Sequence, residues 1–394
     1  MRSFDENIFD GRWSRDIVTL LEMDEVAPDR FRNRHNQPNA YRALFGGQIV
    51  AQALQAADRT TPGRTVHSLH CYFLRAGSAA SPIDYAVERT RDGGRFSTRR
   101  VVARQEDQII FTMECSYRTP IAGFSHQRAM SVPFDPENAL DESAFDAVIG
   151  AENQRYAALF KGHYPIEVRM PGPAGYVETV ADAKRHYWLR APGAERVDDP
   201  ATHRQIFTFL SDFLFAGAPL ARHTVALPGP HLFVASLDHC IWFHRDMRCD
   251  DWLLFETEGP NAQNGVNMAR GFVYNRAGEL VASLAQEALQ YPVDEGDQDY
   301  RSATPPHQRQ SLVRAVVCRS THDAQRRQLG HVVRSGIERD EAVPYQAAMR
   351  DLPCAAAPFI IVEIAARCDK MLLVRCTGAM IGDEIEFAVG PVAF

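Results

Sequence analysis

Apolar positions follow two different periods along the chain, and the two periods occur in the same order in each half. In the first half, residues 45–58 carry apolar side chains at helical spacing, and the helix is expected to end at the turn-forming residues 60–63. Four runs with strand-like alternation follow, at residues 65–74, 83–89, 96–105 and 109–118. This pattern predicts one long helix followed by several antiparallel strands.

The second half repeats that order. A helical run covers residues 202–216, and strand-like runs cover residues 232–245, 252–258, 269–275 and 280–291. Short stretches also correspond in sequence: Val66-His67-Ser68-Leu69-His70 is similar to Val234-Ala235-Ser236-Leu237-Asp238. A helix followed by antiparallel strands, occurring twice, predicts an α+β fold in which each sheet wraps around its own helix.

Two further segments do not fit the repeat. Residues 123–185 are rich in proline and predict a long connection that carries one helix near residues 142–161. Residues 294–314 are mostly polar and predict a linker, and the strand-like runs at 359–365 and 371–377 match neither half. We therefore divide the chain into four parts: residues 1–122, 123–185, 186–293 and 294–394.

The composition excludes several classes of protein. The chain has 394 residues, 45% of them hydrophobic and 24% charged, which is typical of a globular protein. Its net charge of -7 gives no support for nucleic-acid binding. No apolar run approaches the roughly 20 residues of a membrane span, and the first residues lack the apolar core of a signal peptide. We expect a cytoplasmic protein with no membrane partner; for a eukaryotic protein the peroxisome stays open as the alternative location.

Three polar residues stand out because apolar residues surround each of them. Asp212 lies in the segment 206–215, which is otherwise nearly all aromatic and aliphatic, and Ser236 and Gln286 lie in apolar strands. An unpaired buried charge costs several kcal/mol, so such an acid usually has partners or a function. A carboxylate, a hydroxyl and an amide that meet can hold and activate a water molecule. Each also has a structural alternative: Asp212 as an anchor for a strand, Ser236 and Gln286 as polar groups of the core.

Other candidate residues favour structural roles. Asp238 and His239 are adjacent in a strand, so their side chains point to opposite faces and do not form an acid–base pair. We expect packing and hydrogen bonding from His67 and His70. The eight cysteines have no C-x-x-C spacing and no histidine cluster has metal-ligand spacing, so neither a metal nor a cofactor is expected. The motifs of serine hydrolases, zinc proteases and P-loop proteins are absent.

The ordered motifs of the chain resemble the acyl-CoA thioesterase II family, which has two fused hot-dog domains. The resemblance covers about residues 30–292 and rests on these stretches: Phe45-Gly46-Gly47-Gln48, Val66 to Arg75, Ser211-Asp212-Phe213, Ala235 to His239 and Ala285-Gln286-Glu287. Two features depart from the family pattern. Residues 258–269 are not rich in serine, and the tail beyond residue 292 has no counterpart in the usual family member.

The resemblance implies hydrolysis of fatty acyl-CoA to free acid and CoA without a cofactor or metal. It assigns Asp212, Ser236 and Gln286 to a triad that orients the hydrolytic water, and it implies a homo-oligomer, a dimer or a tetramer. Gly46 and Gly47, which lack side chains, would let the substrate approach the first helix closely. Two alternatives stay open: a non-catalytic acyl-CoA sensor, and a hot-dog enoyl-CoA hydratase, for which Asp198 and His203 have a fitting spacing.

Overall fold

A computed structural model describes residues 16–39, 43–148, 164–174, 176, 178–223 and 232–292, together with four short strands beyond residue 310. Contacts divide the chain into two units, Met1–Ala303 and Thr304–Phe394. In the second unit β15 (Ser311–Leu312) pairs with β16 (Ala365–Ala366), and β17 (Met380–Ile381) pairs with β18 (Glu384–Ile385). The linker and the strand-like runs predicted there fall almost entirely outside the described residues.

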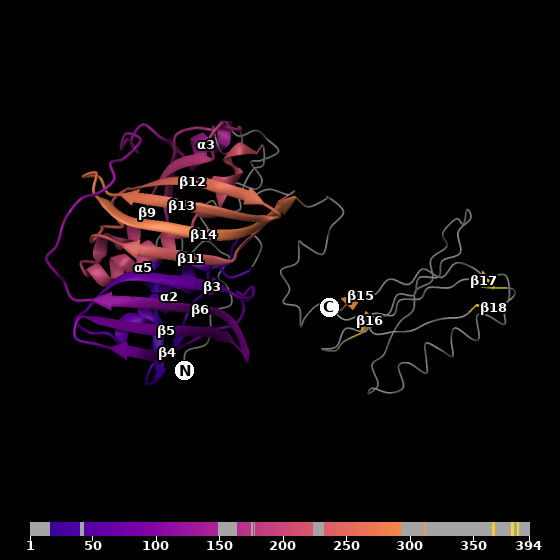
Figure 1. Cartoon of the computed structure of the whole chain (residues 1–394), viewed down its shortest axis with the longest axis horizontal. Coiled ribbons are helices and arrows are strands. Elements are labelled where there is room, and N and C mark those ends of the chain that lie inside the picture. The colour runs from indigo at the N-terminus through magenta and orange to yellow at the C-terminus, as the bar shows by residue number, and fades with distance from the viewer. Residues whose placement is uncertain are drawn as a thin grey trace. The chain divides into compact units, whose positions relative to one another are not determined.

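The first unit is built on one continuous antiparallel sheet (Figure 1). Its strands lie in this order: β1 (Met23–Ala27), β2 (Arg30–Asn33), β4 (Asp84–Asp92), β5 (Phe96–Gln105), β6 (Gln108–Arg118), β3 (Thr65–Phe73), β11 (Asp238–Phe243), β14 (Leu280–Pro292), β13 (Val266–Tyr274), β12 (Leu253–Gln263), β9 (Lys184–Arg190), β8 (Glu167–Met170) and β7 (Leu140–Asp141). The expectation of one sheet per half therefore needs a correction. β3 and β11 pair along their length, with Cys71 opposite His239, and join the two halves edge to edge.

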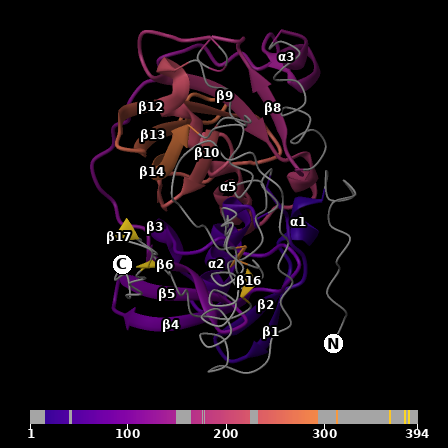
Figure 2. The same ribbon diagram turned by 90° about the vertical axis from the view of Figure 1, so that its right-hand side faces the viewer.

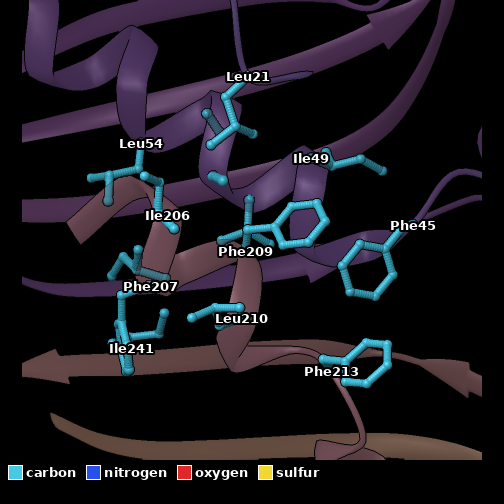
Figure 3. Close-up of a cluster of buried hydrophobic side chains, with 14 of the residues drawn as sticks. Leu21, Phe45, Ile49, Leu54, Ile206, Phe207, Phe209, Leu210, Phe213 and Ile241 are labelled. Atoms are coloured by element: carbon cyan, nitrogen blue, oxygen red, sulfur yellow. The ribbon is translucent and has the colours of Figure 1, made fainter. Parts of the chain in front are cut away.

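Two buried helices lie side by side on one face of this sheet (Figures 1 and 2). They are α2 (Gly46–Arg59) and α5 (Pro200–Ser211), and α2 also packs against β4, β5 and β6. Figure 3 shows Ile206 and Phe209 of α5 directed towards Leu54 and Ile49 of α2. Gly47 permits this close packing, because a Cβ atom there would lie 2.5 Å from the backbone oxygen of Phe209.

The helix and strands predicted for the first half are confirmed to within a few residues, whereas the second half needs two corrections. The helix predicted over residues 202–216 ends at Ser211, and Leu214 then adopts a left-handed conformation with φ of 61°. The 3-10 helix η3 (Phe215–Arg222) follows it. The strand predicted over residues 232–245 is divided at Leu237 into β10 (Leu232–Ser236) and β11. Both parts pair with β14.

The smaller helices complete the first unit. They are α1 (Ile17–Leu20), η2 (Pro192–Arg196) and α3 (Glu142–Val148), the last of which matches the start of the helix predicted near residues 142–161. The rest of that predicted helix falls outside the described residues. None of the described helices combines the length and the apolar composition needed to cross a bilayer.

Candidate active site

The carboxylate of Asp212 lies where the end of one central helix meets the beginning of the other. Asp212 is the first residue after α5, and its carboxylate faces the N-terminus of α2. A Cβ atom on Gly46 would lie 2.7 Å from Asp212 Oδ2 and 3.1 Å from two ring atoms of Phe73. The site is therefore assembled from both halves of the chain, and the glycine leaves room for the acid.

Ser236 and Gln286 converge on this carboxylate. Gln286 donates from Nε2 to Asp212 Oδ1 at 3.2 Å and to Ser236 Oγ at 2.7 Å. The Ser236 hydroxyl donates to the same carboxylate oxygen at 3.4 Å. Strand pairing brings the two residues together, since Ser236 ends β10 opposite Ala288 of β14, two residues from Gln286. The structure thus brings together the three residues that the sequence singled out.

The surroundings of Asp212 keep its protonation close to balance near neutral pH. Loss of solvent raises the pKa of this half-buried carboxyl from 3.8 to about 7, although hydrogen bonds from Gln286, the backbone N–H of Gly47 and Ser236 act in the opposite direction. The C-terminal end of α5 also disfavours the charge, while the N-terminal end of α2 favours it. A carboxyl group tuned in this way can accept a proton and return it under ordinary conditions.

A histidine that the sequence assigned to structure contacts the glutamine. His239 is fully buried, with Nδ1 2.7 Å from Gln286 Oε1 and Nε2 2.8 Å from Ser211 Oγ. Burial lowers its pKa to about 4, so the imidazole is neutral at physiological pH. Asp238 points away from it, as predicted, and accepts from the backbone N–H of Glu287 at 2.7 Å. Sequence alone gave no sign of the His239–Gln286 contact, because it depends on the register of β11 and β14.

Three other histidines that the sequence raised, His67, His70 and His203, bond to groups outside this cluster. His67 contacts Ser116 Oγ at 2.9 Å, and His70 contacts Cys240 Sγ at 3.3 Å, in line with the expected hydrogen bonding. His203 uses both ring nitrogens on backbone groups: Nε2 lies 2.8 Å from Val197 O and Nδ1 3.1 Å from Cys249 N. It therefore cannot serve as an acid–base partner of Asp198. Within the described ranges no three His, Cys, Asp or Glu side chains lie close enough to share a metal ion.

Comparison with known proteins identifies the family. Models described as acyl-CoA thioesterase N-terminal domain and acyl-CoA thioesterase C-terminal domain match residues 35–118 and 136–290. Human acyl-coenzyme A thioesterase 8 is 36% identical over 286 residues, which cover 69% of this chain and 88% of that protein. The chain belongs to the acyl-CoA thioesterase family. It follows that this enzyme is a thioester hydrolase that acts on acyl-CoA.

Solved structures support both the family and the fold of this thioesterase. The crystal structure of an acyl-CoA thioesterase II from Mycobacterium marinum is 33% identical, with a TM-score of 0.57 over 70% of this chain and 98% of that one. A protein with a hot-dog fold from Alicyclobacillus acidocaldarius is 16% identical, with a TM-score of 0.55 over 70% of this chain and 98% of its own. The thioesterase therefore has a hot-dog fold.

An aromatic wall, formed by Phe45, Tyr164 and Phe213, borders the carboxylate of Asp212. Phe45, the residue before α2, packs edge-to-face against Tyr164 at 5.2 Å and against Phe209 at 4.9 Å between ring centroids. Phe213, next to Asp212, lies 5.1 Å from Tyr164 in the same way, and Figure 3 shows it beside Phe45. The contribution of Tyr164 was not predicted, because the residue comes from the long connection between the halves. The charged group thus has an apolar neighbour, as a site for an acyl thioester requires.

Proposed function

We propose that this thioesterase hydrolyses fatty acyl-CoA by direct attack of a water molecule that Asp212, Ser236 and Gln286 hold. The observation that carries the proposal is the convergence of these three side chains, with hydrogen bonds of 2.7 to 3.4 Å, at the N-terminus of α2. A thioester carbonyl is already electrophilic and a thiolate leaves readily. Catalysis must therefore supply a positioned, deprotonated water.

Each group has a defined part in the proposed reaction. Asp212 takes a proton from the water as the oxygen bonds to the carbonyl carbon, a step that general-base catalysis accelerates by typically about 10²- to 10⁴-fold. Ser236 and Gln286 hold the water in line with the carbonyl. The tetrahedral intermediate then breaks its carbon–sulfur bond, and Asp212 returns the proton to the departing CoA thiolate. The products are one fatty acid and one thiol.

The beginning of α2 is suited to the negative charge that develops on the carbonyl oxygen. Phe45 precedes the helix and makes no side-chain capping hydrogen bond, so the first backbone N–H groups are not occupied by a cap. The N–H of Gly47 faces Asp212. We assign the N–H of Gly46 to the thioester oxygen, in keeping with the close substrate approach that Gly46 and Gly47 permit.

The domain organisation belongs to the same proposal. We assign one hot-dog domain to residues 1–122, with α2, and a second to residues 186–293, with α5 and the triad; residues 123–185 connect them and residues 294–394 are an extension. The aromatic wall of Phe45, Tyr164 and Phe213 is assigned to the acyl chain. A homo-oligomer, dimer or tetramer, and a cytoplasmic location complete the proposal.

Thiol release from a panel of acyl-CoAs tests the function, with Asp212→Asn beside the parental chain. We expect release by the parent and the loss of most of it in the variant. Asp58→Asn is the matched control, because Asp58 is a second enclosed carboxyl whose pKa burial raises to about 6, held by Tyr117 and Gln205 at the end of α2. Binding without turnover would support the sensor, water addition without thiol release the hydratase, and full release by Asp212→Asn would refute the triad.

A further inference from the structure

We infer that His239 is a positioning residue, which fixes the side-chain amide of Gln286 with its Nε2 towards Asp212 and Ser236. The inference rests on the proposed function, because it concerns how the water-holding groups are oriented. It adds a fourth residue to the site, one that contacts neither water nor substrate.

A glutamine amide can present either its oxygen or its nitrogen to a neighbour. At 3.2 Å from Asp212 Oδ1, only the nitrogen gives a favourable contact, since an oxygen there would oppose the carboxylate. The nitrogen also donates to Ser236 Oγ at 2.7 Å, which leaves the Ser236 proton free to point at Asp212. A rotated amide would draw the Ser236 proton to itself and break both contacts with the acid.

His239 supplies the contact that prevents this rotation. Its Nδ1 lies 2.7 Å from Gln286 Oε1, an atom that can only accept a hydrogen bond, so Nδ1 must carry a proton. If the amide rotated while His239 kept this tautomer, an NH₂ group would face this N–H donor and one buried hydrogen bond would be lost. A buried donor without its acceptor is costly, so the observed orientation is strongly preferred.

Ser211 permits this tautomer of His239, because its hydroxyl can donate to an unprotonated Nε2. Because burial keeps the imidazole neutral, the proton on Nδ1 leaves Nε2 as an acceptor. Ser211 Oγ lies 2.8 Å from Nε2 and also 2.8 Å from Thr208 O, so its one proton can go to either atom, and the Nδ1–H tautomer requires that it go to Nε2. Ser211 is bonded to Asp212 along the chain, so the contacts from Ser211 through His239 and Gln286 return to Asp212 and form a closed ring. The base and the amide are thereby held to each other.

A pair of amide substitutions separates this role from simple packing. The amide nitrogen of Asn occupies about the place of Nδ1, and that of Gln about the place of Nε2. His239→Asn keeps a donor for Gln286, while Ser211 can turn its proton to Thr208 O, 2.8 Å away. His239→Gln loses the donor to Gln286. His239→Phe also loses it but fills the volume of the ring, so it replaces the Gln variant in the comparison if that variant does not fold.

The readouts are kcat and KM for acyl-CoA, with melting temperatures beside them. We expect His239→Gln and His239→Phe to lower kcat by about 10- to 100-fold at nearly unchanged KM, and His239→Asn to stay within a few-fold of the parent. A packing role predicts the reverse order, because Asn leaves the larger cavity and the lower melting temperature. In a Gln286→Ala background, His239→Gln should cause no further loss of kcat.

Three results would overturn the inference: parental kcat in His239→Gln and His239→Phe, equal losses in the Asn and Gln variants, or additive losses with Gln286→Ala. A failure of the proposed function would give a different result: Asp212→Asn would keep its thiol release. With Asp212→Asn inactive and the Asn and Gln variants of His239 equally affected, the triad would stand and only the role of His239 would fall.

Discussion

Adding one methyl group at the start of α2 should separate catalysis from stability. In Gly46→Ala the new Cβ would lie 2.7 Å from Asp212 Oδ2, whereas ordinary contact begins at 3.4 Å, so the carboxylate must retreat by about 0.7 Å. The hydrogen bonds from Gln286 and Ser236 are already 3.2 and 3.4 Å long, and this shift breaks at least one of them. A displacement of the catalytic carboxylate by this distance should lower kcat by about 10²-fold. The fold should weaken little, because the new Cβ meets only side-chain atoms, those of Asp212 and of the Phe73 ring, which can shift.

The neighbouring substitution, Gly47→Ala, should show the opposite balance. Its Cβ would lie 2.5 Å from the backbone oxygen of Phe209 and 2.6 Å from the ring of Phe45. A backbone oxygen in the last turn of α5 is held by the helix and cannot turn aside, so the two central helices must separate. Overpacking of this kind costs about 1–3 kcal/mol of unfolding free energy. The melting temperature of Gly47→Ala should therefore fall below that of Gly46→Ala.

Two measurements on each variant are sufficient: thermal unfolding by circular dichroism, and thiol release from a long-chain acyl-CoA followed with a thiol-reactive dye. The reasoning would be refuted by a folded Gly46→Ala that releases thiol at the parental rate, because the carboxylate would then not lie against the helix. A Gly47→Ala variant as stable as the parent would refute the proposed helix packing.

Three more predictions concern the triad. The rate should rise with pH up to about 7 and then level, because only ionised Asp212 accepts a proton, and Asp58→Asn should leave this profile unchanged; a rate independent of pH below 7 would contradict the assignment. The raised pKa means that Asp212 destabilises the fold as pH rises from 3.8 towards about 7, at about 1.4 kcal/mol per unit. Above neutral pH, Asp212→Asn should therefore unfold at a higher urea concentration than the parent, and this difference should shrink as the pH falls. Equal urea midpoints above neutral pH would mean that the carboxyl is well solvated. Ser236→Ala should lower kcat about 10-fold or more, whereas Ser236→Thr, which keeps the hydroxyl, should retain most of it; equal rates in the two variants would show that the hydroxyl has no part in the reaction.

Periodicity predicted β3, β4, β5 and β6 well because these strands alternate cleanly and are bounded by turn-forming residues. It failed where the local pattern carries no signal. Nothing in a leucine indicates that Leu214 will adopt a left-handed conformation between α5 and η3. The division of one apolar run at Leu237 depends on its backbone, which bonds to Glu287 O and receives a hydrogen bond from Phe73 N. Both partners are distant in sequence.

The candidate site shows the same limit. Polar residues in apolar segments marked Asp212, Ser236 and Gln286 directly, and the resemblance to thioesterases assigned all three to one triad. Asp212 lies against Gly46 only because two helices from different halves of the chain meet. His239 contacts Gln286 only because β11 pairs with β14 in one particular register. Such long-range pairings are set by the packing of the whole sheet, so a single sequence does not reveal them.

A single turnover in water labelled with heavy oxygen tests the direct attack of water most sharply, with the enzyme in excess over acyl-CoA. If water held by Asp212, Ser236 and Gln286 attacks the thioester, the fatty acid from the first turnover carries one labelled oxygen and Asp212 carries none. An unlabelled fatty acid from that turnover, with the label in the carboxyl group of Asp212, would show that the acid attacks the substrate itself and would contradict the account.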